Sequence, residues 1–132
     1  MKRFLLISGV ALAVAGLAVA AQKATIAELL KSPEKFDGKV VTVKGKVVKF
    51  QQKTSKAGND YFTMKLVDDK DERISVYGRG KHKELKDEAT VEVTGKYAKE
   101  KKVGDVTFKF EVDVTKDEKD KATKDFGIKE VK

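Results

Sequence analysis

Five stretches of the sequence alternate apolar and polar residues with a period of two, and this alternation limits the possible folds more than any other feature. The stretches are Lys39–Phe50, Tyr61–Asp68, Arg73–Gly78, Ala89–Ala98 and Val106–Val114. Side chains in a strand point alternately to opposite faces, so each stretch is expected to form a strand with one face in a core and the other in water. The residues expected inside are Val41, Val43, Phe62, Met64, Leu66, Ile74, Val76, Val91, Val93, Phe108, Phe110 and Val112.

The first of these stretches carries a glycine, Gly45, in its middle. A glycine inside a strand pattern indicates a bulge or a sharp bend, because the backbone can coil there without a side-chain clash. In a small closed barrel the first strand must curl so that it can pair in two sheets. We therefore expect this strand to bend at Gly45.

The remaining segments predict short helices and polar loops. Thr25 followed by Glu28 forms a capping box that should begin a helix ending near Ser32 and Pro33, with one further turn starting there. Lys81–Lys86 fits a helix of one or two turns between the third and fourth strands. We expect Gln51–Asp60 to be a polar loop after the first strand and Lys99–Asp105 a basic hairpin loop after the fourth.

Residues 1–21 have the layout of a bacterial secretory signal. Lys2 and Arg3 precede an apolar run that ends in small residues, with a cleavage site expected after Ala20 or Ala21. Such a signal implies a periplasmic or secreted protein. The alternative is a segment kept as an anchor, since the run just reaches the length of a membrane span. The sequence has no cysteine, so lipid attachment through cysteine and disulfides are both excluded.

The rest of the chain divides into a barrel domain, residues 22–114, and a charged C-terminal tail, residues 115–132. The tail mixes lysines with acidic residues and predicts a flexible or marginally helical segment. Phe126, Ile128 and Val131 are the tail residues that are candidates for docking on the barrel edge.

The order of these elements resembles the OB-fold, the five-stranded Greek-key barrel that binds oligonucleotides or oligosaccharides. Two segments carry the resemblance, FDGKVVTVKGKVVKF from Phe36 and VEVTGKYAKEKK from Val91, within about Phe36–Val114. The first is similar to the opening strand of nucleic-acid-binding, anticodon-binding OB domains, and the exported location is similar to small exported bacterial OB-fold proteins. A small barrel of the SH3 kind is the alternative. The resemblance implies a ligand that crosses the second and third strands between the loops after the first and fourth.

That location contains aromatic and basic residues. A formal net charge of +8 favours polyanionic partners. Tyrosines on which bases stack, with lysines and arginines that contact phosphates, are what a single-stranded nucleic acid site needs. The candidate ligand-binding residues are Lys53, Lys56, Tyr61, Lys65, Arg73, Tyr77, Arg79, Lys99, Lys101 and Lys102. Lysines there can also serve only solubility and protection of sheet edges.

Catalysis and metal binding have little support in the sequence. With one histidine and no cysteine, we expect no metal site and no cofactor, and no nucleophilic triad is evident. The prediction is therefore an all-β, exported binding module for single-stranded nucleic acid or another polyanion, not an enzyme. The alternative is a periplasmic protein- or glycan-interaction or stress-associated protein that never meets nucleic acid.

Overall fold

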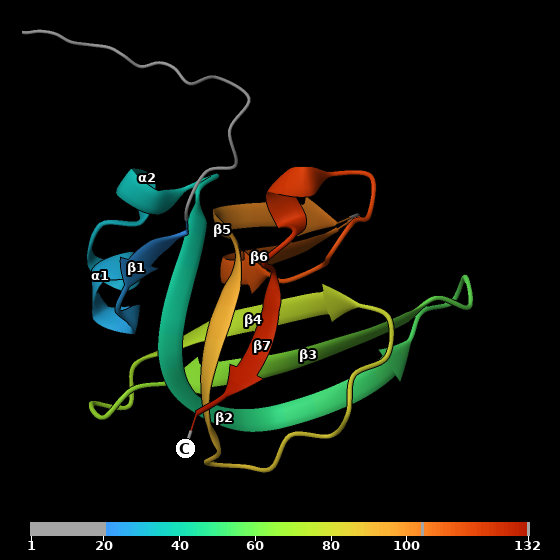
Figure 1. Cartoon of the computed structure of the whole chain (residues 1–132), viewed down its shortest axis with the longest axis horizontal. Helices are drawn as coiled ribbons and strands as arrows, with labels where there is room; N and C mark the ends of the chain where they lie inside the picture. The colour runs from blue at the N-terminus through green and yellow to red at the C-terminus, as the bar shows by residue number, and fades with distance from the viewer. Residues whose placement is uncertain (1–20, 104, 132) are drawn as a thin grey trace, which may run out of the picture.

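The computed structural model describes residues 21–103 and 105–131, so the signal segment expected over 1–21 lies outside the described residues apart from its last one. Seven strands and two short α-helices make up the fold (Figure 1). The strands are β1 (Gln22–Ala24), β2 (Val40–Thr54), β3 (Asp60–Val67), β4 (Arg73–Arg79), β5 (Thr90–Val103), β6 (Val106–Asp113) and β7 (Gly127–Glu130). The helices are α1 (Ile26–Lys31) and α2 (Pro33–Phe36), and a 3-10 turn covers Lys121–Thr123.

The strands form one mixed sheet that closes on itself. Its order is β1-β2-β3-β4-β6-β5-β7, and β2 also pairs with β5, so a ring runs through β2, β3, β4, β6 and β5. Within the ring only β4 and β6 run parallel; the other neighbours are antiparallel. The mostly β class expected from the alternation is confirmed, and the five predicted strands are the five members of the ring.

The ring closes because β2 changes partner in its middle. Its first half pairs with β5 as far as Lys46, and from Lys46 onward it pairs with β3. Figure 1 shows β2 turning sharply between these halves. A Cβ atom at Gly45 would lie 2.8 Å from Leu66 Cγ and 3.0 Å from the Val67 carbonyl oxygen, so no side chain fits on the inside of the bend. The bend expected at Gly45 is confirmed, and a separate bulge follows at Lys49, where φ is 59°.

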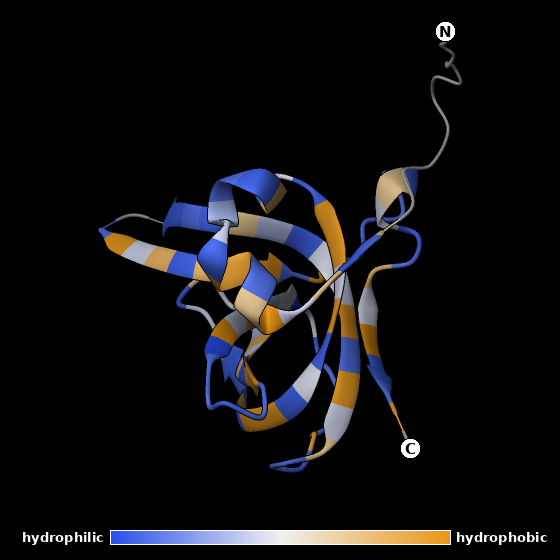
Figure 2. Ribbon diagram, turned by 90° about the vertical axis from the view of Figure 1, so that its left-hand side faces the viewer, coloured by the Kyte–Doolittle hydropathy of each residue, from blue (hydrophilic) through white to orange (hydrophobic). Residues whose placement is uncertain are grey.

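The interior is filled by the apolar faces of the strands, capped by α1. Ten of the twelve residues expected inside are buried, all except Phe108 and Phe110. Figure 2 shows the alternation of hydrophobic and hydrophilic residues along the strands. Tyr97 is also fully buried, and its hydroxyl donates a hydrogen bond of 3.1 Å to the Leu29 carbonyl of α1. The capping box between Thr25 and Glu28 forms as predicted, so α1 is held in place at both ends.

The prediction that Phe108 lies inside is wrong, and Phe110 is only partly buried. Phe110 has a φ of 53°, which interrupts the alternation of β6. Beyond it Glu111 and Val112 are both buried, whereas the preceding half of the strand, from Val106 to Lys109, is exposed. A regular period of two cannot anticipate such a change of face.

The helix expected at Lys81–Lys86 is absent, because this segment has no helical structure. Contacts with the strands of the ring hold this segment in place, rather than hydrogen bonds within its own backbone. The His82 N–H donates to Gln52 Oε1 at 2.9 Å, its ring lies 5.0 Å from the Phe62 ring centroid, and Leu85 is buried.

Two strands run further than predicted, and the loops are correspondingly shorter. β2 continues to Thr54 and β5 to Val103, so Lys53, Lys99, Lys101 and Lys102 are strand residues rather than loop residues. Long twisted hairpins project from the ring where we expected a polar loop and a basic hairpin loop (Figure 1).

The C-terminal segment differs from the flexible or marginally helical tail that its composition predicts. After the 3-10 turn, β7 pairs antiparallel with β5 over Val91–Thr94. Ile128 packs against the core, as one of the three candidates for docking. Apolar residues spaced by two in Phe126–Ile128 were the signal for this strand, but the surrounding charge obscured it.

Candidate functional site

Two tyrosines lie side by side on the outer wall of the ring. Tyr61 precedes the inward Phe62 by one position in β3, and Tyr77 follows the inward Val76 in β4, so both point outward. The register pairs Thr63 with Tyr77 and Tyr61 with Arg79, which makes the tyrosines diagonal neighbours. Their ring centroids are 5.9 Å apart with planes at 37°.

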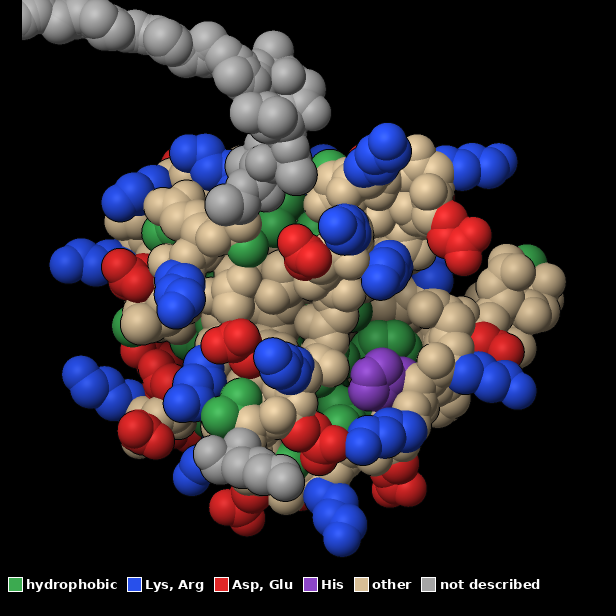
Figure 3. All heavy atoms as spheres, in the orientation of Figure 1, with side chains coloured by type: hydrophobic (Ala, Val, Ile, Leu, Met, Phe, Trp, Pro, Cys, Tyr) green, Lys and Arg blue, Asp and Glu red, His purple; other side chains and the backbone are tan. Residues whose placement is uncertain are grey.

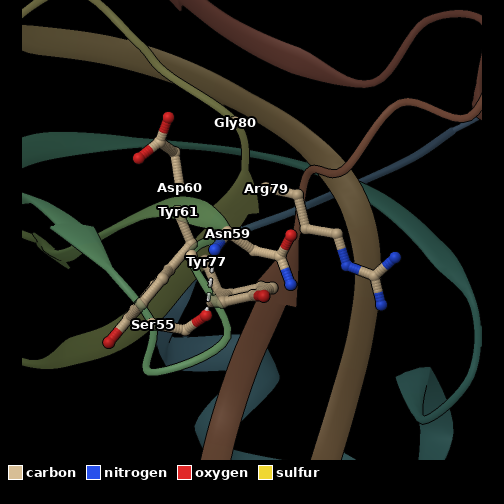
Figure 4. A pocket seen from close by; sticks show the side chains of 8 residues that line it. Ser55, Asn59, Asp60, Tyr61, Tyr77, Arg79 and Gly80 are labelled. Atoms are coloured by element: carbon tan, nitrogen blue, oxygen red, sulfur yellow. Dashed lines mark hydrogen bonds between the residues drawn. The ribbon is translucent and has the colours of Figure 1, made fainter.

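These tyrosines are the floor of a groove that runs between two hairpins. One part of the groove, of about 750 Å³, reaches the β2–β3 turn, and the other, of about 570 Å³, reaches the β5–β6 hairpin. Both parts are lined by Ser55, Tyr61, Tyr77 and Arg79. Figure 4 shows Ser55 and Asn59 of the turn beside the two tyrosines. We call the combined surface the tyrosine groove; its other lining residues are Gly58, Asn59, Asp60, Gly80, Lys101, Lys102, Phe108 and Asp113.

Basic groups of two kinds line the tyrosine groove. Lys101 Nζ lies 4.5 Å from the Tyr77 ring centroid and 2.8 Å from Oε1 of Glu111, so its charge is balanced and its position over the ring is fixed. Among residues 21–103 and 105–131, no carboxylate forms an ion pair with Arg79 or Lys102. These two cations are therefore available to an anionic ligand.

A smaller hollow of about 250 Å³ adjoins the groove. Phe108 lines both hollows and separates them, and Lys65 Nζ in the smaller one donates to Ser75 Oγ at 2.6 Å. We call it the lysine pocket; its lining residues are Lys49, Gln51, Lys53, Thr63, Met64, Lys65, Ser75, Val76, Phe108 and Glu111.

The structure brings together seven of the ten residues predicted to bind ligand. Five line the tyrosine groove, and two line the adjoining lysine pocket. The groove residues are Tyr61, Tyr77, Arg79, Lys101 and Lys102, and the pocket residues are Lys53 and Lys65.

The other three predicted residues lie elsewhere. Lys56 is exposed in the β2–β3 turn and lines neither hollow. Arg73, at the far end of β4, forms an ion pair of 2.9 Å with Asp71. Lys99 forms an ion pair of 2.8 Å with Glu34 of α2; the hydrogen bond between them lowers the pKa of Glu34 and raises the pKa of Lys99.

Sequence reasoning missed Phe108 as an exposed aromatic residue that lines the hollows, because it assigned this residue to the core. The side chain is 38% exposed and supplies a third aromatic surface between the two hollows. The acidic residues Asp60 and Asp113 were also missed; both line the tyrosine groove and reduce its positive charge. Basic and acidic side chains are likewise interspersed on the face drawn in Figure 3.

Comparison with known proteins gives one kind of support, from structure. The chain is similar to a solved protein of Klebsiella pneumoniae subsp. pneumoniae, named there as a provisionally assigned nucleic acid-binding lipoprotein. The TM-score is 0.54 at 22% identity, over 85% of this chain and 92% of that one. At this identity the likeness shows that the two share a fold. No protein-family model and no curated protein matches the sequence.

Two structural features are absent from the described residues, 21–103 and 105–131. In the part of the chain that the structure describes, no helix is long and apolar enough to cross a membrane. The same residues contain no cluster of three or more histidine or acidic side chains arranged to hold a metal ion.

Proposed function

We propose that this protein is an exported OB-fold module that binds single-stranded nucleic acid in the tyrosine groove. The single observation that carries the proposal is the pair of adjacent tyrosines on the β3–β4 wall, flanked by Arg79 and Lys102, which form no ion pair with the described residues. Bases stack on aromatic faces for about 1–3 kcal/mol each, while the cations contact phosphates.

The arrangement of strands supports the OB-fold assignment. Three strands in succession, β2, β3 and β4, are followed by two that return so that β5 meets β2 and β6 meets β4. A five-stranded Greek-key barrel of this kind binds ligands over its second and third strands, between the loops after its first and fourth. The tyrosine groove occupies the same position, and the name of the Klebsiella protein agrees with a nucleic-acid ligand.

Export is proposed from residues 1–21 alone, with a periplasmic or secreted product. We do not extend the lipoprotein name to this chain, because its sequence offers no cysteine for a lipid. We also propose that the protein is a binding module rather than an enzyme, since its hollows present aromatic surfaces for stacking and charged groups that suit the holding of a ligand.

A matched pair of arginines tests the binding proposal. Both Arg73 and Arg79 are on β4, but only Arg79 lines the groove. Fluorescence anisotropy with a labelled single-stranded DNA of eleven nucleotides should show weaker binding for Tyr61→Ala, Tyr77→Ala and Arg79→Ala. The control variant Arg73→Ala should bind with wild-type affinity. Binding by wild type should also fall steeply with salt. Equal effects of the two arginine substitutions, or no binding by wild type, would contradict the proposal.

An oligosaccharide ligand is the second candidate, favoured by Asp60 and Asp113 in the groove. Carboxylates accept hydrogen bonds from sugar hydroxyls but repel phosphates, and tyrosines also pack on sugar rings. A glycan would bind with little dependence on salt, whereas DNA would give no titration signal.

A further inference from the structure

Glu111 is an unusual residue to find in the wall of a binding surface. The register of β4 and β6 places Glu111 beside Ser75 on the outer side of the ring, opposite to the inward Val112, yet its side chain is only 4% exposed. Lys101 Nζ lies 2.8 Å from Oε1 and balances the charge, yet the geometry does not make a hydrogen bond, and Oε1 has no hydrogen-bond partner among the described residues. This buried carboxylate oxygen has an ion-pair partner but no well-aligned hydrogen-bond donor, so the site favours a ligand that supplies such a donor.

The surroundings of Glu111 define the size and shape of that ligand. The lysine pocket that it lines has a volume of about 250 Å³, below the roughly 300–1,000 Å³ of pockets that hold drug-sized molecules, so it suits a single small ring system. Phe108 offers a face on which a ring can stack. Lys65 and Ser75, already joined at 2.6 Å, place hydrogen-bond donors in the same pocket.

We propose that the lysine pocket is a base-selective subsite that takes cytosine in preference to thymine or uracil. The inference rests on the proposed function, because it assumes a nucleic-acid strand in the adjoining groove. Cytosine presents an exocyclic amino group, which donates to the Glu111 carboxylate, and two acceptors, which receive hydrogen bonds from Lys65 and Ser75. Carboxylates accept from the cytosine amino group elsewhere in nucleic-acid recognition.

Thymine and uracil have nearly the same size but carry a carbonyl oxygen where cytosine has the amino group. In the same pose that oxygen would face the Glu111 carboxylate, so two acceptors would meet in a buried site with no proton between them. Strand charge and backbone are identical for the two bases. The discrimination therefore comes from the pocket, whereas the salt-dependent part of binding comes from the groove.

The experiment compares labelled dC11 and dT11 in anisotropy titrations at one salt concentration. We expect wild type to bind dC11 about tenfold more tightly, the size of one hydrogen bond to a charged group. Glu111→Gln should reduce the ratio to about one, because the amide can present either an oxygen or an NH2 group. Glu92→Gln is the control, because Glu92 is a carboxylate on β5 that lines neither hollow; this variant should keep the tenfold ratio.

A modified DNA strand tests the same contact in the wild-type protein, so the result does not depend on how the Glu111→Gln variant folds. In dC11 with every cytosine replaced by 2-pyrimidinone, which lacks only the amino group, wild type should lose the advantage over dT11. Equal affinity for dC11 and dT11, or a preference that Glu111→Gln and the modified strand both leave intact, would overturn the inference while leaving the proposed function standing. Failure to bind any strand would overturn the proposed function and the inference together.

Discussion

Alanine substitutions at Gly45 and Gly95 test whether the ring is closed as described. At Gly45 a Cβ atom would approach Leu66 Cγ to 2.8 Å, the Val67 carbonyl oxygen to 3.0 Å and Ile26 Cδ1 to 3.1 Å. At Gly95 a Cβ atom would overlap the backbone carbonyl group of Asp113, whose carbon lies 2.8 Å away. At both positions another strand of the ring lies too close for a side chain to fit without a shift.

The expected magnitudes follow from what each new methyl group meets. Overpacking costs about 1–3 kcal/mol, and alanine recovers about 0.5–1 kcal/mol relative to glycine in a strand. Side chains can shift around Gly45, so we expect a net loss of about 1–2 kcal/mol. The obstacle at Gly95 is backbone, which has no other rotamer, so the loss there should reach about 3 kcal/mol or more.

Thermal unfolding followed by circular dichroism measures these losses. For a domain of this size, about 1 kcal/mol corresponds to a fall of about 4 °C in Tm. Lys44→Ala, an exposed neighbour in the same strand, is the control and should change stability by less than about 0.5 kcal/mol. A Tm for Gly45→Ala equal to or above that of wild type would refute the bend, and equal losses at Gly45 and Gly95 would refute the reasoning about backbone obstruction.

Three further predictions concern ionisable groups. Burial raises the pKa of Tyr97 to about 12, so an absorbance titration of the folded protein should show one late-ionising tyrosine, which Tyr97→Phe removes. Stability should also fall between about pH 10 and 12, because Tyr97 ionises at a lower pH in the unfolded chain than in the folded protein. The Lys99 ammonium lowers the pKa of Glu34, so Glu34→Gln should destabilise the protein at neutral pH. The free energies of unfolding of the two proteins, measured with urea, should converge as the pH falls below about 4, because the wild-type carboxylate is then protonated. Arg79→Ala should reduce the slope of log affinity against log salt by about 0.7, as expected for one phosphate contact to a single strand, and an unchanged slope in anisotropy titrations would show that Arg79 contacts no phosphate.

Local patterns sufficed to predict the parts of the fold that depend on local chemistry. The capping box at Thr25 begins a helix in any context that leaves its backbone free, and the alternation in Tyr61–Asp68 and Arg73–Gly78 identified strands with the correct inward face. Gly45 also carried its own signal, because only a bend or a close approach explains a glycine there.

The errors arose where distant contacts override the local pattern. The sequence 81–86 has enough charge and length for a helical turn, but hydrogen bonding of His82 to Gln52 and burial of Leu85 favour an extended path. Phe108 and Glu111 exchanged their expected environments because of one backbone angle at Phe110. No property of those residues in isolation reveals that exchange.

The candidate site was predicted in part for the same reason. Tyr61 and Tyr77 belong to neighbouring strands with a regular register, so their proximity followed from the strand assignment. Lys99 was misplaced because its position depends on an ion pair with Glu34, sixty-five residues earlier, which the strand pattern does not contain.

The most direct test of the whole account is an amide NMR titration of residues 22–132 with dC11. We predict that chemical-shift changes concentrate on the residues of the tyrosine groove and the lysine pocket, around Tyr61, Tyr77 and Phe108, and that they weaken at high salt. Changes confined to α1 and β7, or a spectrum that dC11 leaves untouched, would contradict the claim that this wall of the ring binds a nucleic-acid strand.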